Sequence, residues 1–263
     1  MCGRSSIGGS LAKSTVKAIA ARAGYRIQRI QRIQPRYPAD FDATLIQTVE
    51  RVAPYTQTTP EGIAATCQAA EYLVGHGIPG ACVECGVWRG GSMMAVALTL
   101  LGLGERERDL YLFDTFAGMP EPGAADVSLE GADAQSEWQR RRSGDVSEWN
   151  AVAVDEVRAA MLATGYPADR VHYVEGKVEE SLPTSAPERI ALLRLDTDWY
   201  ESTRHELVHL FPRLSPGGVL IVDDYGFWLG ARQAVDEYFA SEGVRIMLGR
   251  IDVSGRLAIK QGG

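Results

Sequence analysis

Apolar residues form short uninterrupted runs along most of the chain, and these runs alternate with segments in which apolar residues recur every three or four positions. The runs predict buried strands, and the segments predict helices that cover them. One helix should begin with Thr59 as N-cap and Pro60 at its first position, and should end at 77–80. Strands are predicted at 81–85, 110–113, 171–174, 191–195, 218–222, 245–248 and 257–260, and further helices at 43–52, 92–101, 150–164, 202–210 and 230–241.

This alternation predicts a mostly parallel sheet covered by helices on both faces. The last two predicted strands are joined through residues 250–255, and they predict an antiparallel hairpin. We therefore expect an α/β fold with a doubly wound, seven-stranded sheet that ends in an antiparallel hairpin. That architecture is typical of the Rossmann-like class I methyltransferases.

Two neighbouring apolar runs stop at acidic residues. One run ends at Asp196-Thr197-Asp198, and the next ends at Asp223-Asp224. If both runs are adjacent parallel strands, their carboxyl ends bring four acids to the edge of the sheet where ligands bind. Because like charges repel, such a cluster implies strongly raised pKa values or a bound cation. We interpret it as a site for a divalent metal ion.

A glycine-rich loop follows the first predicted strand, with Glu84, Gly86, Gly90-Gly91 and Ser92 in the spacing E-x-G-x-x-x-G-G. Glycines let the backbone approach a ligand closely, and the next helix then directs its N-terminus at that ligand. The spacing differs from the G-x-G-x-x-G of dinucleotide binders. It favours S-adenosylmethionine, which has no pyrophosphate, and the acid before the first glycine suits the cationic end of that cofactor.

The next two strands also end at candidate cofactor residues. Asp114-Thr115-Phe116 ends the second strand, where a carboxylate can accept both ribose hydroxyls. The alternative for Asp114 is an N-cap. Gly176 follows the third strand and should lie beside the adenine, which a glycine allows to approach closely.

Composition and net charge argue against several classes of protein. The chain has 263 residues and a net charge of -7, from 27 basic and 34 acidic residues, which argues against a dedicated nucleic-acid binder. No apolar stretch approaches the roughly 20 residues of a membrane span, and the start of the chain lacks the apolar core of a signal peptide. We expect a cytoplasmic protein. Cys82 and Cys85 have CxxC spacing but no partner pair for zinc, so they predict buried thiols.

Two regions depart from the alternating pattern. Residues 1–36 form a basic arm, in which Ile27, Ile30 and Ile33 make a loose helical stripe. We interpret the arm as a surface segment or a contact in a homo-oligomer, with a membrane or nucleic-acid contact as the alternative. Residues 117–150 are rich in Gly, Pro and acids and predict an irregular insertion that acts as a substrate lid. The remainder, 37–263, is expected to be one domain.

The pattern H-E-x-x-H of zinc proteases occurs at His205-Glu206-Leu207-Val208-His209. Helical geometry places both histidines away from the apolar face, and the segment downstream is a predicted strand instead of a helix with a third ligand. We interpret the motif as a solvated helix face. Asp196-Thr197-Asp198 also matches the DxD of metal-dependent glycosyltransferases, which remains an alternative, as does a catechol-type magnesium methyltransferase.

Taken together, these stretches resemble the macrocin O-methyltransferase family, the sugar O-methyltransferases of antibiotic and natural-product biosynthesis. The resemblance runs from about Tyr37 to Lys260. It is carried by the motifs YPADFD at Tyr37, TPEGI at Thr59, VECGVWRGGSMM at Val83, YLFDTFAGMP at Tyr111, LLRLDTDWYEST at Leu192 and GGVLIVDDYGFW at Gly217.

The resemblance implies an enzyme that depends on S-adenosylmethionine and Mg²⁺ and methylates a sugar hydroxyl of a glycosylated small molecule. It implies Asp198 as general base. Family members often have a polar residue, commonly His, at the position of Phe227, which leaves the sugar and the methylated hydroxyl open. The implied metal ligands are Asp196, Asp223 and Asp224, and the implied cofactor-binding residues are Thr58, Thr59, Glu84, Gly86, Gly90, Gly91, Ser92, Asp114, Thr115, Phe116 and Gly176.

The chemistry of the residues agrees with this reaction. A sugar hydroxyl is a poor nucleophile at neutral pH, and a hard cation held by carboxylates can stabilise the developing alkoxide. A fourth carboxylate can take the proton, so that methyl transfer mainly needs in-line positioning. Trp199, Tyr200 and Tyr225 are candidates for an apolar wall around the acceptor, with a plain packing role as the alternative.

Overall fold

The computed structural model describes residues 36–143 and 146–262. The chain divides into two compact units, Met1–Ala39 and Asp40–Gly263. All of the helices and strands described below belong to the second unit. Nearly all of the predicted basic arm, including the stripe of Ile27, Ile30 and Ile33, lies outside the described residues.

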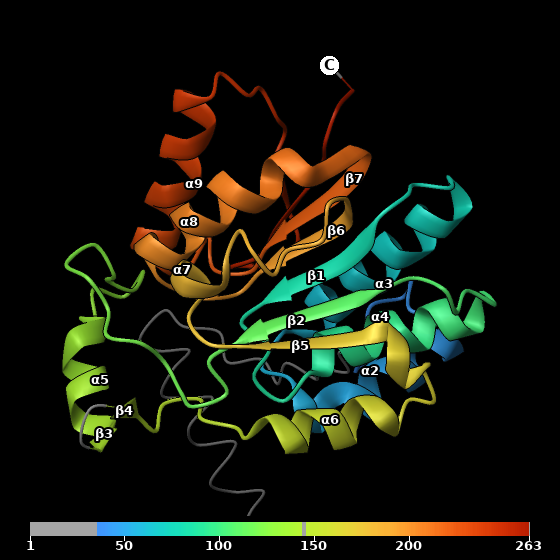
Figure 1. Ribbon diagram of the computed structural model, residues 1–263, viewed down its shortest axis with the longest axis horizontal. Coiled ribbons are helices and arrows are strands. Elements are labelled where there is room, and N and C mark those ends of the chain that lie inside the picture. Colours follow the sequence, from blue (N-terminus) through green and yellow to red (C-terminus); the bar gives the residue numbers. More distant parts are fainter. Residues whose placement is uncertain (1–35, 144–145, 263) are drawn as a thin grey trace, which may run out of the picture. The chain divides into compact units, whose positions relative to one another are not determined.

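A seven-stranded sheet forms the centre of the second unit, with the order β5-β2-β1-β6-β7-β9-β8 (Figure 1). The first five strands of that order are parallel, whereas β9 runs antiparallel to both β7 and β8. The chain moves outward from β1 to β5 and returns to β6, so the strand order reverses beside β1, where open sheets bind ligands. The strands are β1 Ala81–Cys85, β2 Leu110–Asp114, β5 Val171–Glu175, β6 Ile190–Leu195, β7 Leu214–Val222, β8 Gly249–Arg250 and β9 Arg256–Ile259.

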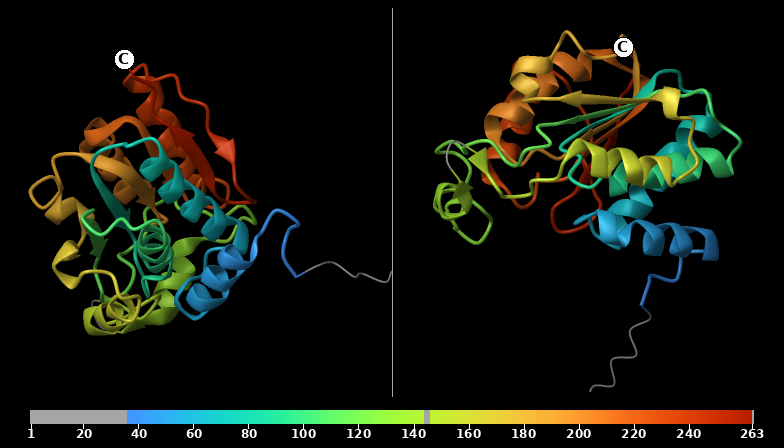
Figure 2. Two further views of the ribbon diagram at one scale, coloured as in Figure 1. Left: turned by 90° about the vertical axis from the view of Figure 1, so that its right-hand side faces the viewer. Right: turned by 60° about the horizontal axis from the view of Figure 1, so that its bottom comes forward.

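Helices cover both faces of the sheet, as the views in Figures 1 and 2 show. One layer contains helices α2 to α4 and α6, which pack on one another, and the other contains α7, α8 and α9. The helices are α2 Ala43–Val52, α3 Pro60–Gly75, α4 Gly91–Gly102, α5 Ala134–Arg141, α6 Val154–Leu162, α7 Val178–Ser181, α8 Tyr200–Leu210 and α9 Leu229–Ser241, with 3-10 turns at Ala53–Tyr55, Ala168–Arg170 and Phe211–Arg213.

The central strands form because their residues can be buried on both faces. Every residue of β1 and β6 is buried. One core cluster joins residues of β7, α8 and α9 with Ala81, Val83, Cys85, Ile190, Leu193 and Leu195. Continuous burial explains why these strands are apolar runs without alternation. Helix α3 begins as predicted, because the Thr59 hydroxyl accepts a hydrogen bond from the backbone N–H of Gly62 and Pro60 occupies the first position.

The predicted α/β fold with a mostly parallel seven-stranded sheet and a terminal antiparallel hairpin is confirmed. The strand predicted at 245–248 is wrong, because β8 begins at Gly249. Val244, Ile246 and Leu248 alternate with exposed residues and pack partly against the core, without forming a strand. The alternation of partly buried and exposed side chains therefore resembles the pattern of a strand, although the segment does not form one.

The insertion at 117–150 is less irregular than predicted. It contains α5 and a two-stranded hairpin, β3 Arg142–Ser143 and β4 Val146–Ser147. Helix α5 begins where Asp133 accepts a hydrogen bond from the backbone N–H of Gln135. The insertion lies beyond the carboxyl ends of β1, β2 and β5 (Figure 1).

The H-E-x-x-H motif does not form a zinc site. The rings of His205 and His209 lie 4.4 Å apart on α8. Within the described ranges, one group of three side chains is arranged to hold a metal ion, and it contains neither histidine. Glu206 differs from our interpretation of a solvated face, because it is fully buried and accepts a hydrogen bond from the Thr197 hydroxyl at 2.9 Å.

Candidate active site

A cavity of about 420 Å³ opens at the carboxyl edge of the parallel strands. One end is lined by residues of the predicted cofactor site, and the other by aromatic residues from the insertion and from the loop after β7. The four clustered aspartates belong to the lining of the same cavity. The lining includes Thr58, Gly86, Trp88, Asp114, Thr115, Gly176, Met119, Trp149, Asn150, Asp196, Asp198, Asp223, Asp224, Phe227, Trp228 and Ser254.

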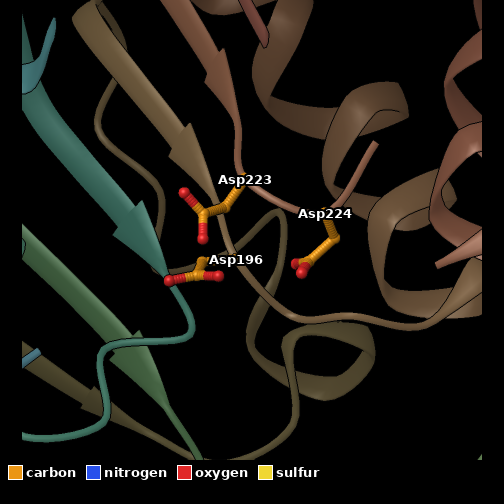
Figure 3. Close-up of side chains that lie close together, drawn as sticks. All are labelled: Asp196, Asp223 and Asp224. Carbon is orange, nitrogen blue, oxygen red and sulfur yellow. The ribbon is translucent and has the colours of Figure 1, made fainter. Parts of the chain in front are cut away.

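The three acids that the family resemblance implies as metal ligands lie close together. Strands β6 and β7 are adjacent and parallel, with Leu195 opposite Val222, so Asp196 lies beside Asp223. Oxygen atoms of Asp196, Asp223 and Asp224 lie within 4.8 Å of one another (Figure 3). Ser254 supports this arrangement, because its hydroxyl donates a hydrogen bond of 2.5 Å to the backbone oxygen of Asp223.

A buried arginine, Arg194, lies at the centre of the acids. Its guanidinium donates to Asp196 at 2.5 Å and to Glu84 at 3.0 Å, and it pairs with Asp223 at 2.8 Å. It also donates to the Thr58 hydroxyl at 2.8 Å. Because the Arg194 side chain is only 1% exposed, these partners are needed to compensate its desolvation. The chain therefore provides one permanent cation of its own within the cluster.

One guanidinium does not neutralise five nearby carboxyl groups, and their pKa values are raised. Burial is the main cause in each case. It raises the pKa of Glu84 to about 8 and that of Asp223 to about 7, although Arg194 acts in the opposite direction on both. The pKa of Asp196 is raised, and that of Asp224 lies well above its ordinary value. For these carboxyl groups, the effect of burial therefore exceeds that of Arg194.

The predicted general base, Asp198, occupies a constrained turn. Its φ of 66° lies in the left-handed region, and its backbone N–H donates to the Asp224 carboxylate at 3.2 Å. Burial and the charge of Asp196 raise the pKa of Asp198 to about 7, whereas hydrogen bonds with Asp224 and the Trp228 side chain lower it. A carboxyl group with a pKa near neutrality can accept a proton at neutral pH.

Positive φ angles concentrate around the cavity. In the described ranges, four non-glycine residues have this conformation: Trp88, Phe116, Asn150 and Asp198. Three of them line the cavity, and Phe116 directly follows Asp114 and Thr115. Strained backbone tends to gather at functional sites, where the surrounding structure holds it in place.

The cofactor end is held together by its own backbone. The Asp114 carboxylate accepts hydrogen bonds from the backbone N–H groups of Val87 at 2.7 Å, Trp88 at 2.9 Å and Phe116 at 2.8 Å. Asp114 therefore ties the glycine-rich loop to the end of β2, whereas we expected only a ribose contact or an N-cap. Gly86 has a φ of 83°, and a Cβ added there would overlap the backbone oxygen of Asp196.

Several predicted cofactor residues do not line the cavity. Glu84 is buried and turned to Arg194, which is its cross-strand neighbour, so it does not face the cofactor space as expected. The Thr59 hydroxyl donates to the Asp252 carboxylate. A Cβ added to Gly91 would come within 2.6 Å of Tyr55 and Thr56. The predicted residues absent from the cavity wall are Thr59, Glu84, Gly90, Gly91, Ser92 and Phe116.

The acceptor wall also differs from the sequence prediction. Trp199, Tyr200 and Tyr225 do not line the cavity. Trp199 is buried in an aromatic cluster with Trp149 and Trp228, whose ring centroids lie 5.7 and 5.0 Å from its own. Trp149, Phe227 and Trp228 line the cavity instead. Trp149 lies in the non-periodic insertion, so the hydrophobic pattern gave no signal for it.

The family model described as Macrocin-O-methyltransferase (TylF) matches residues 26–258. The chain belongs to this family. Family membership sets aside the glycosyltransferase alternative and makes the chain an O-methyltransferase.

Curated members of the family are similar over about two thirds of their length. The 8-demethyl-8-(2,3-dimethoxy-alpha-L-rhamnosyl)-tetracenomycin-C 4'-O-methyltransferase of Streptomyces olivaceus is 37% identical over 185 residues, which are 70% of this chain and 67% of that protein. The demethyldecarbamoylnovobiocin O-methyltransferase of Streptomyces niveus is 35% identical over 188 residues, covering 72% of this chain and 69% of that protein.

Solved structures show the same fold. The O-methyltransferase NovP is 31% identical, with a TM-score of 0.69, and the match covers 79% of this chain and 83% of NovP. The calicheamicin methyltransferase CalS11, at 18% identity and a TM-score of 0.56, shares the fold over 82% of this chain and 91% of its own. The fold is that of the S-adenosylmethionine-dependent methyltransferases. Among the helices described for this chain, none has the length and apolar character required to span a membrane.

Proposed function

We propose that this O-methyltransferase transfers a methyl group from S-adenosylmethionine to a sugar hydroxyl of a glycosylated natural product, with Mg²⁺ at the acceptor end of the cavity. The observation that carries the proposal is the meeting of two sites in one cavity. Asp114 and Gly86 lie at one end, and Asp198 lies beside the cluster of three further aspartates. A methyl donor and a metal-assisted acceptor would therefore be neighbours.

The residues present fit a magnesium ion. Asp196, Asp223 and Asp224 offer carboxylate oxygens, which are the ligands that this hard cation prefers. Arg194 uses one oxygen of Asp196 and one of Asp223, which leaves the second oxygen of each for a cation. Burial raises the pKa values of all three carboxyl groups, and a bound cation would favour their ionised forms. A bound magnesium ion would stabilise negative charge on the acceptor oxygen.

The other end of the cavity fits S-adenosylmethionine, which supplies the methyl group on its sulfonium. Gly176 lines the cavity, and among the described residues no atom outside this glycine and its chain neighbours lies within 4 Å of an added Cβ, so the space beside it is open. We assign that space to the adenine. Asp114 can accept a ribose hydroxyl in addition to its backbone donors, because a carboxylate has about four acceptor sites. Thr58 and Thr115 complete this end of the lining.

Asp198 is proposed to accept the proton of the attacking hydroxyl. Its pKa of about 7 suits a general base at neutral pH. The hydrogen bond with the Trp228 side chain orients its carboxylate, and the Thr197–Glu206 hydrogen bond holds the same turn from the buried side. These contacts fix the base before the acceptor enters, which favours productive geometry.

The aromatic end of the cavity supports a glycoside as acceptor. Trp149, Phe227 and Trp228 provide flat apolar surfaces, and Met119 and Pro120 of the insertion continue them. Sugars and apolar aglycones both pack on aromatic faces. Relatives named for a rhamnosyl-tetracenomycin and for mycinamicin III agree with that class. We extend the proposal to residues 117–150, which would cover the bound acceptor.

A binding experiment tests the cofactor assignment. Calorimetric titration with S-adenosylhomocysteine should show tight binding, whereas a nucleotide-sugar should show none. The opposite result would reject the proposed function. The metal site is tested separately by comparing methyl transfer in a sample with added Mg²⁺ and in a sample treated with a chelator. Only the sample with Mg²⁺ should support methyl transfer.

An acceptor screen tests the substrate class. Glycosides and simple catechols are incubated with S-adenosylmethionine and Mg²⁺, and products are read by mass for the gain of one methyl group. We expect methylated glycosides. Methylation of catechols alone would favour a catechol-type enzyme with the same metal chemistry, and turnover that survives exhaustive chelation would refute the role of the metal.

A further inference from the structure

The insertion is fastened to the segments that carry the predicted metal ligands and base. The backbone N–H of Leu129 donates to Phe227 O at 2.7 Å, and that of Leu229 donates to Val127 O at 2.9 Å. The Trp199 indole donates to Pro120 O at 3.1 Å. The first part of the insertion is therefore hydrogen-bonded both to the residue after the Asp196–Asp198 turn and to the loop after β7.

Asp126 is the buried centre of this attachment. Asp126 is 1% exposed. It belongs neither to the cluster of Asp196, Asp223 and Asp224 nor to the cavity lining. One carboxylate oxygen accepts a hydrogen bond from the backbone N–H of Tyr200 at 2.8 Å, and the other accepts from Gly123 at 2.7 Å. A Cβ added to Gly230 would overlap the first of these oxygens. The carboxylate thus fills the place that glycine leaves near the start of α9.

The contact with Tyr200 replaces a missing helix cap. Helix α8 begins at Tyr200, and its N-cap residue, Trp199, makes no side-chain capping hydrogen bond. The first N–H groups of a helix have no partner within the helix, and a carboxylate there also interacts favourably with the helix dipole. Asp126 provides this cap from a segment that is 74 residues distant in sequence.

The helix start that Asp126 caps is two residues from the proposed base. Asp198 has a left-handed φ of 66°, a conformation that depends on the structure around it. On one side its backbone N–H is held by Asp224, and on the other the chain enters α8 through Trp199 and Tyr200. Loss of the hydrogen bond between Asp126 and the Tyr200 backbone N–H would therefore let the Asp198 carboxylate move relative to the acceptor.

We propose that Asp126 is a positioning residue, which caps α8 from the insertion and thereby fixes the orientation of Asp198. The proposal rests on the proposed function for the role of Asp198, and it assigns the insertion a structural part in catalysis in addition to covering the acceptor. It also explains why a buried carboxylate lies in a segment that is otherwise mainly polar and exposed.

The test uses two variants of the full chain and one control. Asp126→Ala removes both hydrogen bonds. Asp126→Asn retains one acceptor oxygen but places an amide donor against one of the two backbone N–H groups. Asp133→Ala is the matched control, because Asp133 lies in the same insertion and also accepts a backbone N–H, but from α5.

Amide hydrogen exchange reads the cap without any substrate. We expect faster exchange over residues 198–203 in Asp126→Ala, an intermediate effect in Asp126→Asn, and no change there in Asp133→Ala. Unchanged exchange over 198–203 in Asp126→Ala would overturn the proposal. This readout is independent of whether the acceptor has been identified, so it separates failure of the cap from failure of the proposed function.

Kinetics with a glycoside acceptor that the screen shows to be methylated then read the positioning. A displacement of about 1 Å can cost on the order of 100-fold in rate, so kcat should fall by about 10- to 100-fold in Asp126→Ala, and by less in Asp126→Asn. The Kd for S-adenosylhomocysteine should stay within about twofold. A general loss of folding would instead weaken S-adenosylhomocysteine binding together with kcat, and that result would refute a positioning role.

Discussion

The two ends of the cavity are built by different means. At the cofactor end, the Asp114 carboxylate is bonded to three backbone N–H groups, and the glycines of the loop pack closely on neighbouring protein atoms. At the acceptor end, the important groups are buried side-chain carboxyls, with Arg194 as the cation among them. The cofactor end is electrostatically satisfied by the chain itself, whereas the acceptor end is not.

The difference shows which end should respond to added ions. Burying a charge without enough compensation is costly, so the carboxyl groups around Arg194 hold protons more tightly than usual. A divalent cation would relieve that imbalance. Substitutions at the two ends should therefore separate binding of the cofactor from turnover.

The largest separation is expected from Asp198→Asn. The amide cannot accept a proton, and general-base catalysis contributes roughly 100- to 10,000-fold, so kcat should fall by that order. Calorimetry should show unchanged S-adenosylhomocysteine and Mg²⁺ binding, because Asp198 belongs to neither set of ligands. Full activity in this variant would remove Asp198 as the base.

Gly86→Ala should affect cofactor binding and metal binding together. Gly86 lies in the loop at the cofactor end and packs against the backbone of Asp196. The added Cβ would overlap the backbone oxygen of Asp196 and would also require a φ of 83°. Gly165→Ala is the control, since Gly165 has a φ of 84° but no protein atom within 4 Å of the added Cβ. The left-handed conformation alone costs about 1–2 kcal/mol.

We expect thermal denaturation to show a clearly larger loss of stability for Gly86→Ala than for Gly165→Ala. Gly86→Ala should also weaken both S-adenosylhomocysteine and Mg²⁺ binding, because the backbone of Asp196 must move. Equal stability losses in the two variants would mean that the close contact with Asp196 is not important.

Trp228→Phe sharpens the description of the acceptor end. The indole hydrogen bond lowers the pKa of Asp198, so its loss should raise that pKa. The base works in its ionised form, and the acidic limb of the kcat profile should therefore move to higher pH, with kcat near neutrality reduced by about tenfold, or 1.4 kcal/mol. Trp138→Phe is the control, because its indole bonds Met119 O instead. An unmoved acidic limb would contradict the predicted contact.

The smallest effect concerns pH and stability. Burial raises the pKa values of Asp198 and Asp223 to about 7 in the metal-free fold, above their ordinary values. The folded state then holds these protons more tightly than the unfolded chain, so metal-free stability should decrease as pH rises through about 7.

Mg²⁺ requires ionised carboxylates, so it should raise Tm more at pH 8 than at pH 6. An additional 1 kcal/mol corresponds to about 2–4 °C for a protein of this size. Calorimetric melting with and without Mg²⁺ measures the difference. An equal shift at both pH values would contradict ionisation of these groups on metal binding.

Much of the fold and half of the site could be predicted from local pattern. Apolar runs gave the parallel strands, and acids placed at the ends of two adjacent runs gave the cluster of Asp196, Asp223 and Asp224. These predictions succeed because parallel strands end at a common edge. The strand expected at 245–248 failed because partial burial alternated there without backbone pairing.

The rest of the site depends on contacts between distant segments. Arg194 lies within an apolar run, and its partner Glu84 is 110 residues away, so nothing local indicated an ion pair. Trp149 and Asp126 belong to an insertion without hydrophobic periodicity. Glu84 was expected to face the cofactor, but the register between β1 and β6 turns it to Arg194. Local spacing cannot supply such register information.

The fit between Asp126 and Gly230 has a practical consequence for exchanging acceptor loops between relatives. A graft of residues 117–150 would transfer the carboxylate but leave the recipient's residue at 230 in place, and any side chain larger than glycine would compete with that carboxylate for space. Chimeras that carry both positions from one parent should therefore give active, folded enzymes more often than those that carry only the loop. The unit of recombination is the loop together with the start of α9.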